Sequence, residues 1–410
     1  MFALIPFLDQ HLRVDRTMQS NKVVITGIGI ISSLGEGLDA HWSAFSKAGS
    51  EPRLEKEAFA PYTVHPLGEV DWGLQIPKRG DQRQMETWQR LGTYAAGLAL
   101  DDAGMKDDEA LCASMDMIVG AGGGERDITV DMQILEEGRT SNNRGVMLNE
   151  KLSTELRPTL FLAQLSNLLA GNISIVHKVT GSSRTFMGEE GSGISAIETA
   201  AARIRSGQST HALVGGSYNS EHFDMILGHE LGGLLKHDGW ASLWDREGSA
   251  GGGMISGSGG VFLVLESADH AQKRGARAYA EIANIESAQV RRDAADLAKT
   301  VRELVLAANG GKEPAYVVSG ASGAHEATAA EKIALEAISA AYRGISGLTG
   351  HLREAQFPLA LALAAISVWK GEAFAPCSAS EKAVDGTVSE AIVTTIGATR
   401  AEGAAKLVRA

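Results

Sequence analysis

Cysteine is nearly absent from this chain, which has two cysteines among 410 residues. Cys112 and Cys377 cannot form the disulfide framework of a small secreted domain or a four-cysteine zinc site. A reducing, cytoplasmic setting is therefore the expected one. Either thiol remains a candidate nucleophile, so the places of the two cysteines in the fold bear directly on function.

The chain also lacks a long hydrophobic run. No segment approaches the ~20 apolar residues of a membrane-spanning helix, so we expect no membrane span. Segment 1–8 is apolar but has no basic start and no small-residue cleavage site, which makes it a poor signal peptide. We predict that residues 1–20 are an N-terminal extension, with Met1 and Met18 as the two candidate starts.

An excess of basic residues is missing as well, since 38 lysines and arginines stand against 50 acidic residues, a net charge of −12. Nucleic-acid binding needs a basic footprint, so nucleic acid is not an expected partner. The glycine-rich segments 120–124 and 248–260 lack both the lysine of a phosphate loop and the spacing of a dinucleotide site. No group of His, Cys, Asp and Glu has metal-ligand spacing, so we expect neither a cofactor nor a metal.

Apolar, β-branched segments alternate with helical segments along the whole chain. Strands are predicted over 22–31, 115–120, 211–216, 259–266, 278–290, 315–320 and 390–396, and helices over 37–47, 86–103, 191–205, 292–308, 326–341 and 355–370, with another inside 157–175. This alternation is typical of a largely parallel α/β sheet covered by helices. The element order repeats, so we predict two duplicated halves, an N-terminal half over 21–267 and a C-terminal half over 268–410.

Two polar features interrupt this pattern. Glu189 and Glu190 precede the predicted helix at 191–205. A carboxylate at a helix N-terminus is favoured by roughly 0.3–1 kcal/mol, so helix capping is the better interpretation of the pair from composition alone. His351 precedes an apolar helix, where a neutral imidazole can form a hydrogen bond to a substrate carbonyl. The residues alone thus indicate an α/β protein with one histidine of interest.

Four segments carry motifs of one known family. They are Val23-Val-Ile-Thr-Gly-Ile-Gly29, Asn167-Leu-Leu-Ala-Gly171, the block from Leu263 to Glu281 with its Ala-Gln-Lys-Arg-Gly-Ala core, and Thr349-Gly-His-Leu352. With them the chain resembles, over about 21–408, the beta-ketoacyl-acyl-carrier-protein synthases, which are condensing enzymes of thiolase-like fold. The resemblance implies duplicated halves in α-β-α-β-α layers. It also implies an acyl carrier protein as partner, and a dimer.

The resemblance also implies where the family's catalytic residues fall. Its nucleophilic cysteine, at the N-terminus of a buried helix, falls on Glu190. Its first histidine falls on Gly320, while Glu331 of the same motif is retained. Its second histidine is His351, and the lysine ahead of that histidine is replaced by Ser346.

Two further positions complete this comparison with the family. Ala398 stands where the glycine-rich loop near the C-terminus carries a gating phenylalanine. Cys112 and Cys377 fall outside every catalytic motif, so we predict structural roles for both. The scaffold is therefore expected to be retained without most of the machinery, and losing one member of a cooperating set usually removes most of the rate.

Three interpretations stay open on the sequence. The first is a non-condensing subunit of fatty acid or polyketide biosynthesis, similar to chain-length factors, which pairs with a cysteine-containing synthase in a heterodimer; a homodimer is also open. The second is a malonyl-carrier-protein decarboxylase that supplies primers and relies on His351. The third is an active 3-oxoacyl-carrier-protein synthase that uses Cys112 or Cys377.

Overall fold

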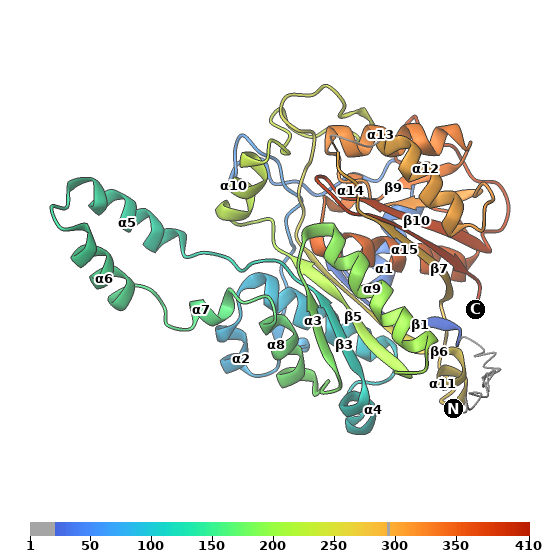
Figure 1. Ribbon diagram of the computed structural model, residues 1–410, viewed down its shortest axis with the longest axis horizontal. Coiled ribbons are helices and arrows are strands. Elements are labelled where there is room, and N and C mark those ends of the chain that lie inside the picture. Colours follow the sequence, from blue (N-terminus) through green and yellow to red (C-terminus); the bar gives the residue numbers. More distant parts are fainter. Residues whose placement is uncertain (1–20, 293–295) are drawn as a thin grey trace, which may run out of the picture.

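The computed structural model describes residues 21–292 and 296–410, so the predicted extension 1–20 lies outside the described residues. Within these ranges, strands hydrogen-bond along the path β4-β3-β5-β6-β1-β7-β11-β10-β8-β9, and β2 pairs beside β1 (Figure 1). The strands are β1 (Val23–Ser32), β2 (Gly35–Glu36), β3 (Asp116–Gly120), β4 (Ser183–Phe186), β5 (His211–Tyr218), β6 (Gly259–Ser267), β7 (Ala280–Ala288), β8 (Tyr316–Ser319), β9 (Ala341–Gly344), β10 (Glu390–Ile396) and β11 (Glu402–Val408).

The two halves of the sheet repeat one topology. In the N-terminal half β3 is parallel to β4 and β5, and β6 is antiparallel to β5 and β1. In the C-terminal half β8 is parallel to β9 and β10, and β11 is antiparallel to β10 and β7. When the five main strands of each half are numbered along the chain, both halves read 3-2-4-5-1, which confirms the predicted duplication.

The expectation of a largely parallel sheet is wrong, because two of the four contacts inside each half are antiparallel. In the C-terminal half β10 and β11 are antiparallel because only the short segment 397–401 connects them. A connection of that length joins antiparallel neighbours, whereas a parallel pair needs a long crossover.

The halves meet along a short antiparallel contact between β1 and β7, with Val24 opposite Glu281 and Ile25 opposite Ala280. β6 ends at Ser267 and β7 begins at Ala280, so the repeat changes from one half to the other between these residues. The division into halves at 267/268 stays a prediction.

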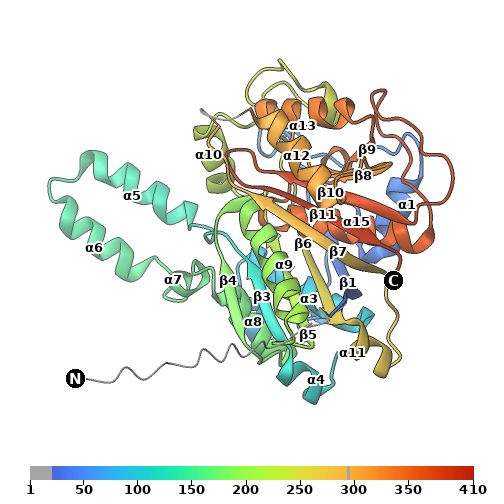
Figure 2. The same ribbon diagram turned by 45° about the vertical axis from the view of Figure 1, so that its right-hand side comes forward.

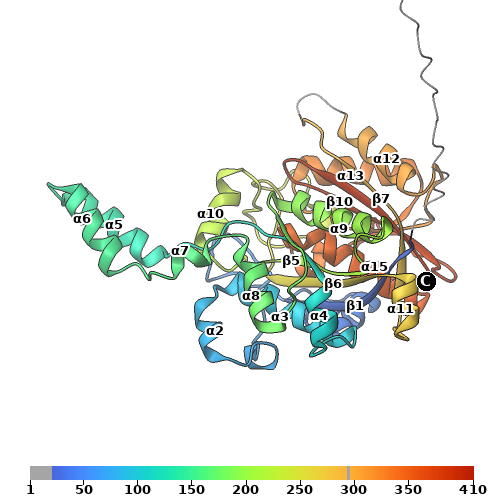
Figure 3. The ribbon, with the colours of Figure 1, turned by 60° about the horizontal axis from the view of Figure 1, so that its bottom comes forward.

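Two buried helices form the middle layer between the halves of the sheet (Figure 3). They are α9 (Glu189–Arg205) and α15 (Gln356–Lys370). Ile194, Ile197 and Ile204 of α9 belong to one core cluster that also holds the apolar side chains of α15 and of strands from both halves. Together with Ala201 these isoleucines recur at three- and four-residue spacing, which is the spacing of a core-facing helix side and is what predicts this helix from the sequence.

Helix pairs cover the outer faces of the sheet. In the N-terminal half these are α3 (Thr87–Asp102) and α8 (Leu168–His177), and in the C-terminal half α12 (Leu297–Ala308) and α13 (His325–Ala337). Figures 1 and 3 show the order of outer helices, sheet, middle helices, sheet and outer helices. This is the predicted α-β-α-β-α arrangement.

A helical arm projects from the N-terminal half, and no helix was predicted for most of it. It consists of α5 (Ile128–Thr140), α6 (Arg144–Thr154) and α7 (Leu160–Ala163), and we call residues 126–165 the arm (Figures 1 and 2). Large apolar side chains remain exposed along it, namely Met132, Leu135, Val146, Leu148, Leu152, Phe161, Leu162 and Leu165. In the single chain these apolar side chains are exposed to solvent.

The other helices are short or peripheral. They are α1 (Gly37–Ser46), α2 (Arg79–Gln84), α4 (Glu109–Ser114), α10 (Phe223–Leu231), α11 (Ala268–Lys273), α14 (Ser346–Thr349) and the 3₁₀ turns η1 (Trp72–Leu74), η2 (Leu243–Asp245) and η3 (Arg353–Ala355). Among the described residues, no helix has both the length and the apolar character needed to cross a bilayer.

Several boundaries differ from the sequence prediction, and the helix expected over 292–308, for example, begins at Leu297. The helix expected inside 157–175 is two helices, α7 and α8. The helix expected over 326–341 ends at Ala337, because Ser339 takes a left-handed conformation with φ of 53° and the chain turns into β9. α9 begins at Glu189, two residues earlier than predicted, which places Glu190 in its first turn.

Candidate active site

The first turn of α9 holds the residue that the resemblance matches to a nucleophile. Glu190 is 2% exposed and follows Gly188, with φ of 128°, and Glu189, with φ of 54°. A left-handed conformation costs a non-glycine residue roughly 1–2 kcal/mol, and such strain concentrates at functional sites. The N-cap residue, Gly188, makes no side-chain capping bond, but both glutamates lie in the first turn, where the helix dipole favours a carboxylate as expected.

Glu190 and His351 form a buried pair, although 161 positions separate them in the chain. His351 Nε2 lies 2.8 Å from Glu190 Oε1, and His351 is 1% exposed. The backbone N–H of Ala398 donates to the same carboxylate oxygen at 3.2 Å. The backbone N–H of His351 donates to the carbonyl of Ile255 at 2.9 Å and holds the histidine beside the segment before β6.

Electrostatics favour the ionised form of Glu190. Burial raises the pKa of Glu190, but the hydrogen bond and charge of His351, with the Ala398 N–H, bring the pKa below its ordinary value of 4.5. An ionised carboxylate only accepts hydrogen bonds, so His351 Nε2 carries the proton between them. Glu190 Oε2 and His351 Nδ1 have no partner among the described residues, so the pair can still accept a hydrogen bond or exchange a proton.

More charged side chains surround this pair. Arg353 places Nη2 3.4 Å from Glu189 Oε1 and Nε 3.6 Å from Glu354 Oε1. Glu354 is fully buried, and burial raises its pKa against the opposing charge of Arg353. Thr399 Oγ1 donates to Glu189 Oε2 at 3.0 Å, which ties the loop after β10 to α9. The surroundings of Glu190 are therefore polar and charged rather than apolar.

The predicted first-histidine position is closed by its neighbours. A Cβ at Gly320 would collide with Thr395 Oγ1 and lie 3.3 Å from Gln356 Cγ. Gln356 also donates through Nε2 to Ser346 Oγ at 2.9 Å, while Ser346 Oγ donates to the carbonyl of Ala321 at 2.6 Å. Gln356 thus fills the space between the two positions where the family pattern has a histidine and a lysine.

Glu331 is buried without a cationic partner among the described residues. Its Oε1 accepts hydrogen bonds from Ser319 Oγ at 2.7 Å and Thr394 Oγ1 at 2.6 Å, and its Oε2 has no partner. Burial raises the pKa of Glu331, and the two hydroxyls only partly oppose this. A protonated, neutral carboxyl is the form that this environment favours.

Only some of the predicted site residues are therefore in direct contact with one another. Glu190 and His351 touch, and Gly320 and Ser346 meet at Gln356, whose Oε1 accepts the N–H of the residue after His351. Glu331 belongs to a separate hydroxyl cluster. That these are the family's catalytic positions stays a prediction.

The sequence analysis missed Arg353, Glu354 and Gln356. A signal was present, since charged residues directly follow the Gly-His-Leu motif at the start of an otherwise apolar helix. Only the fold shows that they fill the space around Glu190 and Ser346, because these contacts join segments far apart in the chain.

Neither cysteine is prepared for nucleophilic attack. Cys112 lies buried in α4, where its Sγ contacts the carbonyl of Met105 at 3.4 Å. Burial, with the charges of nearby aspartates, raises its pKa. Burial and the charge of Glu381 raise the pKa of Cys377 to about 11. A raised pKa leaves little thiolate at neutral pH, so both thiols are poor nucleophiles.

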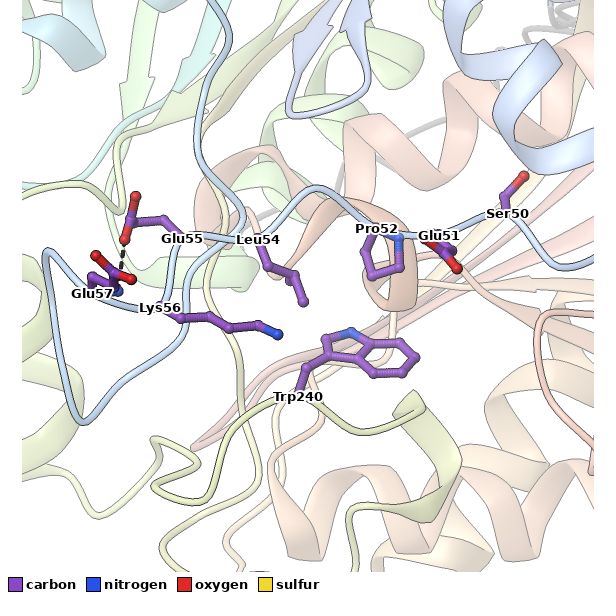
Figure 4. Close-up of a pocket in the computed structure, with 8 residues that line it drawn as sticks. All are labelled: Ser50, Glu51, Pro52, Leu54, Glu55, Lys56, Glu57 and Trp240. Carbon is purple, nitrogen blue, oxygen red and sulfur yellow. Dashed lines mark hydrogen bonds between the residues drawn. The ribbon is translucent and has the colours of Figure 1, made fainter.

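Two surface cavities are defined by the residues that line them. One of about 450 Å³ opens beside the start of α9, lined by residues of 187–195, 287–289 and 400–402. Another, of about 670 Å³, is formed by residues of 50–57 together with Trp240 (Figure 4). Among the described residues, no group of three or more His, Cys, Asp and Glu side chains could hold a metal ion.

Sequence comparisons connect the chain with one family. The family model described as "Beta-ketoacyl synthase, N-terminal domain" matches residues 20–271. The 3-oxoacyl-[acyl-carrier-protein] synthase 2 of Vibrio cholerae is 27% identical over 278 residues, which are 65% of this chain and 62% of the relative. The tetracenomycin polyketide synthase ketoacyl synthase beta subunit of Streptomyces glaucescens is 29% identical over 265 residues, 62% of this chain and 60% of the relative. The chain thus spans less than two thirds of the length of these relatives.

Solved structures share the fold at low identity. The ishigamide ketosynthase/chain length factor matches with a TM-score of 0.74 and 20% identity, over 95% of this chain and 100% of the other. A beta-ketoacyl synthase from Burkholderia phymatum matches over the same shares, with a TM-score of 0.76 and 19% identity. At this identity the match establishes the thiolase-like fold and no more.

Proposed function

Since the chain belongs to the beta-ketoacyl synthase family, we propose that it is a non-condensing homologue of fatty acid or polyketide biosynthesis that serves as the partner of a cysteine-containing synthase. Its role is then similar to that of a chain-length factor. One observation carries this proposal: the first turn of α9 presents Glu190, buried and hydrogen-bonded to His351, where the family pattern requires a thiol.

The chemistry of Glu190 opposes condensation by this chain. Acyl transfer in this family needs a thiolate that forms a thioester, and a carboxylate paired with an imidazole cannot replace it. Ionised Glu190 would also repel the carboxylate of a malonyl unit brought close to it. Moreover, His351 Nε2 is already engaged by Glu190 and cannot donate to an enolate without breaking that bond.

The space around the pair also disfavours an acyl chain. Arg353 and Glu354 bring charge into this region, and Gln356 fills the gap between Gly320 and Ser346. Bringing a hydrocarbon tail among buried charges strips them of hydrogen-bonding partners without compensation. These contacts support a site that does not itself carry the growing product.

The surface of the N-terminal half supports a partner subunit. β4 hydrogen-bonds only to β3 among the described strands, so its other edge is open. An open edge is a template for pairing with another chain, and the arm beside it exposes a series of large apolar side chains. We place the partner synthase against β4 and the arm, and an acyl carrier protein at the assembled pair; a homodimer would use the same surface.

The decarboxylase interpretation has one observation in its favour. His351 is retained, and its Nδ1 has no partner among the described residues. Decarboxylation nevertheless requires a donor toward the developing enolate, while Nε2 points to an anionic neighbour. This function therefore ranks second.

The test compares the purified chain with the chain co-expressed with a cysteine-containing synthase from the same organism. We expect the chain alone to acquire no acyl adduct from acyl or malonyl carrier protein by intact mass, and to co-purify with that synthase. An adduct that vanishes in Cys112→Ser or Cys377→Ser would establish the active-synthase interpretation instead. Release of carbon dioxide that His351→Ala abolishes would favour the decarboxylase.

The docking surface is tested in the same co-purification. Leu135→Ser on α5, where the side chain is 62% exposed, should weaken recovery of the partner at least tenfold. The matched control is Ile333→Ser on α13, 59% exposed on the opposite half of the molecule, which should leave recovery unchanged. Equal recovery with both variants would contradict the placement of the partner.

A further inference from the structure

Arg246 is a buried cation without a counter-charge. It follows η2 in the segment between β5 and β6 and is 1% exposed. Its Nε donates to the carbonyl of Ala241 at 3.0 Å, but Nη1 and Nη2 have no partner among the described residues. No carboxylate in that part of the chain forms an ion pair with it, whereas the buried Glu190 and Glu354 each have a basic partner.

This arrangement is energetically incomplete. An unpaired ion in a protein interior is strongly disfavoured unless it is neutralised or hydrogen-bonded. Burial lowers the pKa of Arg246 to about 9, which is still above neutral pH, so the guanidinium keeps its charge. The guanidinium of Arg246 therefore has two nitrogen atoms without a hydrogen-bond acceptor and a positive charge without a counter-ion among the described residues.

The unpaired end of Arg246 faces the start of a helix. A Cβ built on Gly323 would lie 2.7 Å from Arg246 Nη1, and Gly323 has φ of 89°. Gly323 lies two residues ahead of α13, whose N-cap is Ala324 and makes no side-chain capping bond. The positive end of a 13-residue helix and a free guanidinium thus converge on one place.

A third group borders this place. His65 is fully buried, and burial, with the charge of Arg246, lowers its pKa to about 3. At neutral pH the imidazole is therefore uncharged, and because neither ring nitrogen has a partner among the described residues, its one N–H is free to donate. It adds a donor without adding a second positive charge to the interior.

We propose that a small oxyanion, a phosphate or carboxylate group, binds between Arg246 and the N-terminus of α13. A guanidinium matches the paired oxygens of either group, and the positive end of the helix dipole favours an anion. Water could satisfy the hydrogen bonds but could not neutralise the charge. The inference does not depend on whether the chain condenses acyl groups, so it goes beyond the proposed function.

The loop that carries Arg246 also borders a surface cavity. Arg246 lies in the same loop as Trp240, which lines the surface cavity of Figure 4. The residue that accepts the Nε bond, Ala241, directly follows that tryptophan. The loop that carries the guanidinium therefore also reaches this surface pocket, from which an ion enters on local opening.

The experiment uses the full chain, freed of anions by dialysis into a buffer without phosphate, sulfate or carboxylate. Inorganic phosphate and malonate are titrated separately, with binding followed by calorimetry and the thermal midpoint followed at each concentration. We expect saturable binding of at least one anion and a rising midpoint. Binding of phosphate alone assigns a phosphoryl ligand, and binding of malonate alone assigns a carboxylate.

Variants decide whether Arg246 forms the site. Arg246→Gln should weaken binding at least tenfold and Arg246→Lys less, because lysine keeps the charge and loses the paired donors. The matched control is Arg277→Gln, an exposed arginine bonded to Asp102, which should bind as the wild type does. Gly323→Ala should also weaken binding, since its Cβ enters the space beside Nη1.

Two results would overturn the proposal. One is the absence of saturable binding of phosphate and malonate to the wild-type chain, which needs no variant and is therefore independent of any folding defect. The other is unchanged affinity in a folded Arg246→Gln chain. In either case, ordered water or local opening would have to solvate the guanidinium.

Discussion

The two halves of this molecule share one strand order and differ in what connects the strands. In the N-terminal half the connection from β3 to β4 spans 121–182 and carries the arm and α8, whereas the matching connection from β8 to β9 spans 320–340 and carries α13 alone. The connection from β5 to β6 spans 219–258, against 397–401 in the other half. Elaboration is thus concentrated on one copy of a duplicated unit, beside its open edge at β4.

The halves also differ in how each keeps a carboxyl group inside. Glu190 of the N-terminal half meets His351 and has a lowered pKa, whereas Glu331 of the C-terminal half meets two hydroxyls and has a raised pKa. Both side chains are almost fully buried. The charged state of a buried carboxyl therefore depends on its partner and not on burial alone.

The largest expected effect comes from breaking the pair of Glu190 and His351, which joins the two halves. His351→Ala should lower the free energy of unfolding by about 3–5 kcal/mol at pH 7, because it leaves the charge of Glu190 buried without compensation. Urea unfolding measures this, and the double variant Glu190→Gln with His351→Ala should recover part of the loss. A His351→Ala chain within about 0.5 kcal/mol of the wild type would contradict an ionised Glu190.

The next prediction asks whether the two middle helices, α9 and α15, contribute equally to the stability of the hydrophobic core. Ile197→Ala in α9 and Ile366→Ala in α15 should each cost about 2–5 kcal/mol, since both side chains are fully buried between the halves of the sheet. Equilibrium unfolding of the two variants gives the comparison. A loss in only one helix would mean that the halves do not share a cooperative middle layer.

The two buried carboxyls should give pH dependences of opposite sign. Glu190, with a lowered pKa, stabilises the fold above its unfolded pKa near 4.5, and this contribution is lost as pH falls through the folded pKa. Glu331, with a raised pKa, contributes fully below 4.5 and loses its contribution as pH rises through the folded pKa.

This sign difference is measured with two amides. The stability of the wild type relative to Glu190→Gln should shrink toward acid, while its stability relative to Glu331→Gln should shrink as pH rises from 4.5 toward neutrality. Unfolding free energies from urea titrations at several pH values provide both curves. Parallel curves would show that one of the two carboxyls is in the other protonation state.

The smallest expected effect lies in the arm. Leu148→Ser on α6 should change the unfolding free energy of the isolated chain by less than about 0.5 kcal/mol, because the side chain is already exposed. The midpoint of urea unfolding tests this. A loss of more than about 2 kcal/mol would mean that the arm is part of the core and not a surface for a partner.

Most of the regular core was predictable from apolar spacing. The isoleucines at 194, 197 and 204 predicted α9, and the β-branched run from Val23 predicted β1. Short edge strands were not predictable in this way. β9 has four residues, of which only Ala341 falls within the helix predicted over 326–341, and Tyr342 and Arg343 belong to no alternating pattern long enough to recognise.

The arm was missed although its sequence carries a signal. Its helices α5 and α6 are as amphipathic as α9, so their apolar spacing already indicates helices. The start of α9 was missed because the left-handed conformations at Gly188 and Glu189 depend on tertiary contacts. Propensity does not encode such a position for a glutamate.

The sequence by itself determined the family and the duplicated α/β architecture, and it singled out Glu190 and His351 as residues of interest. Only the tertiary structure decided that these two side chains share a hydrogen bond, that Gln356 closes the space beside Gly320, and that Arg246 lies buried without a counter-charge. The physical reason is that motifs and periodicity are local, whereas burial and charge pairing depend on segments brought together by the sheet and its middle helices.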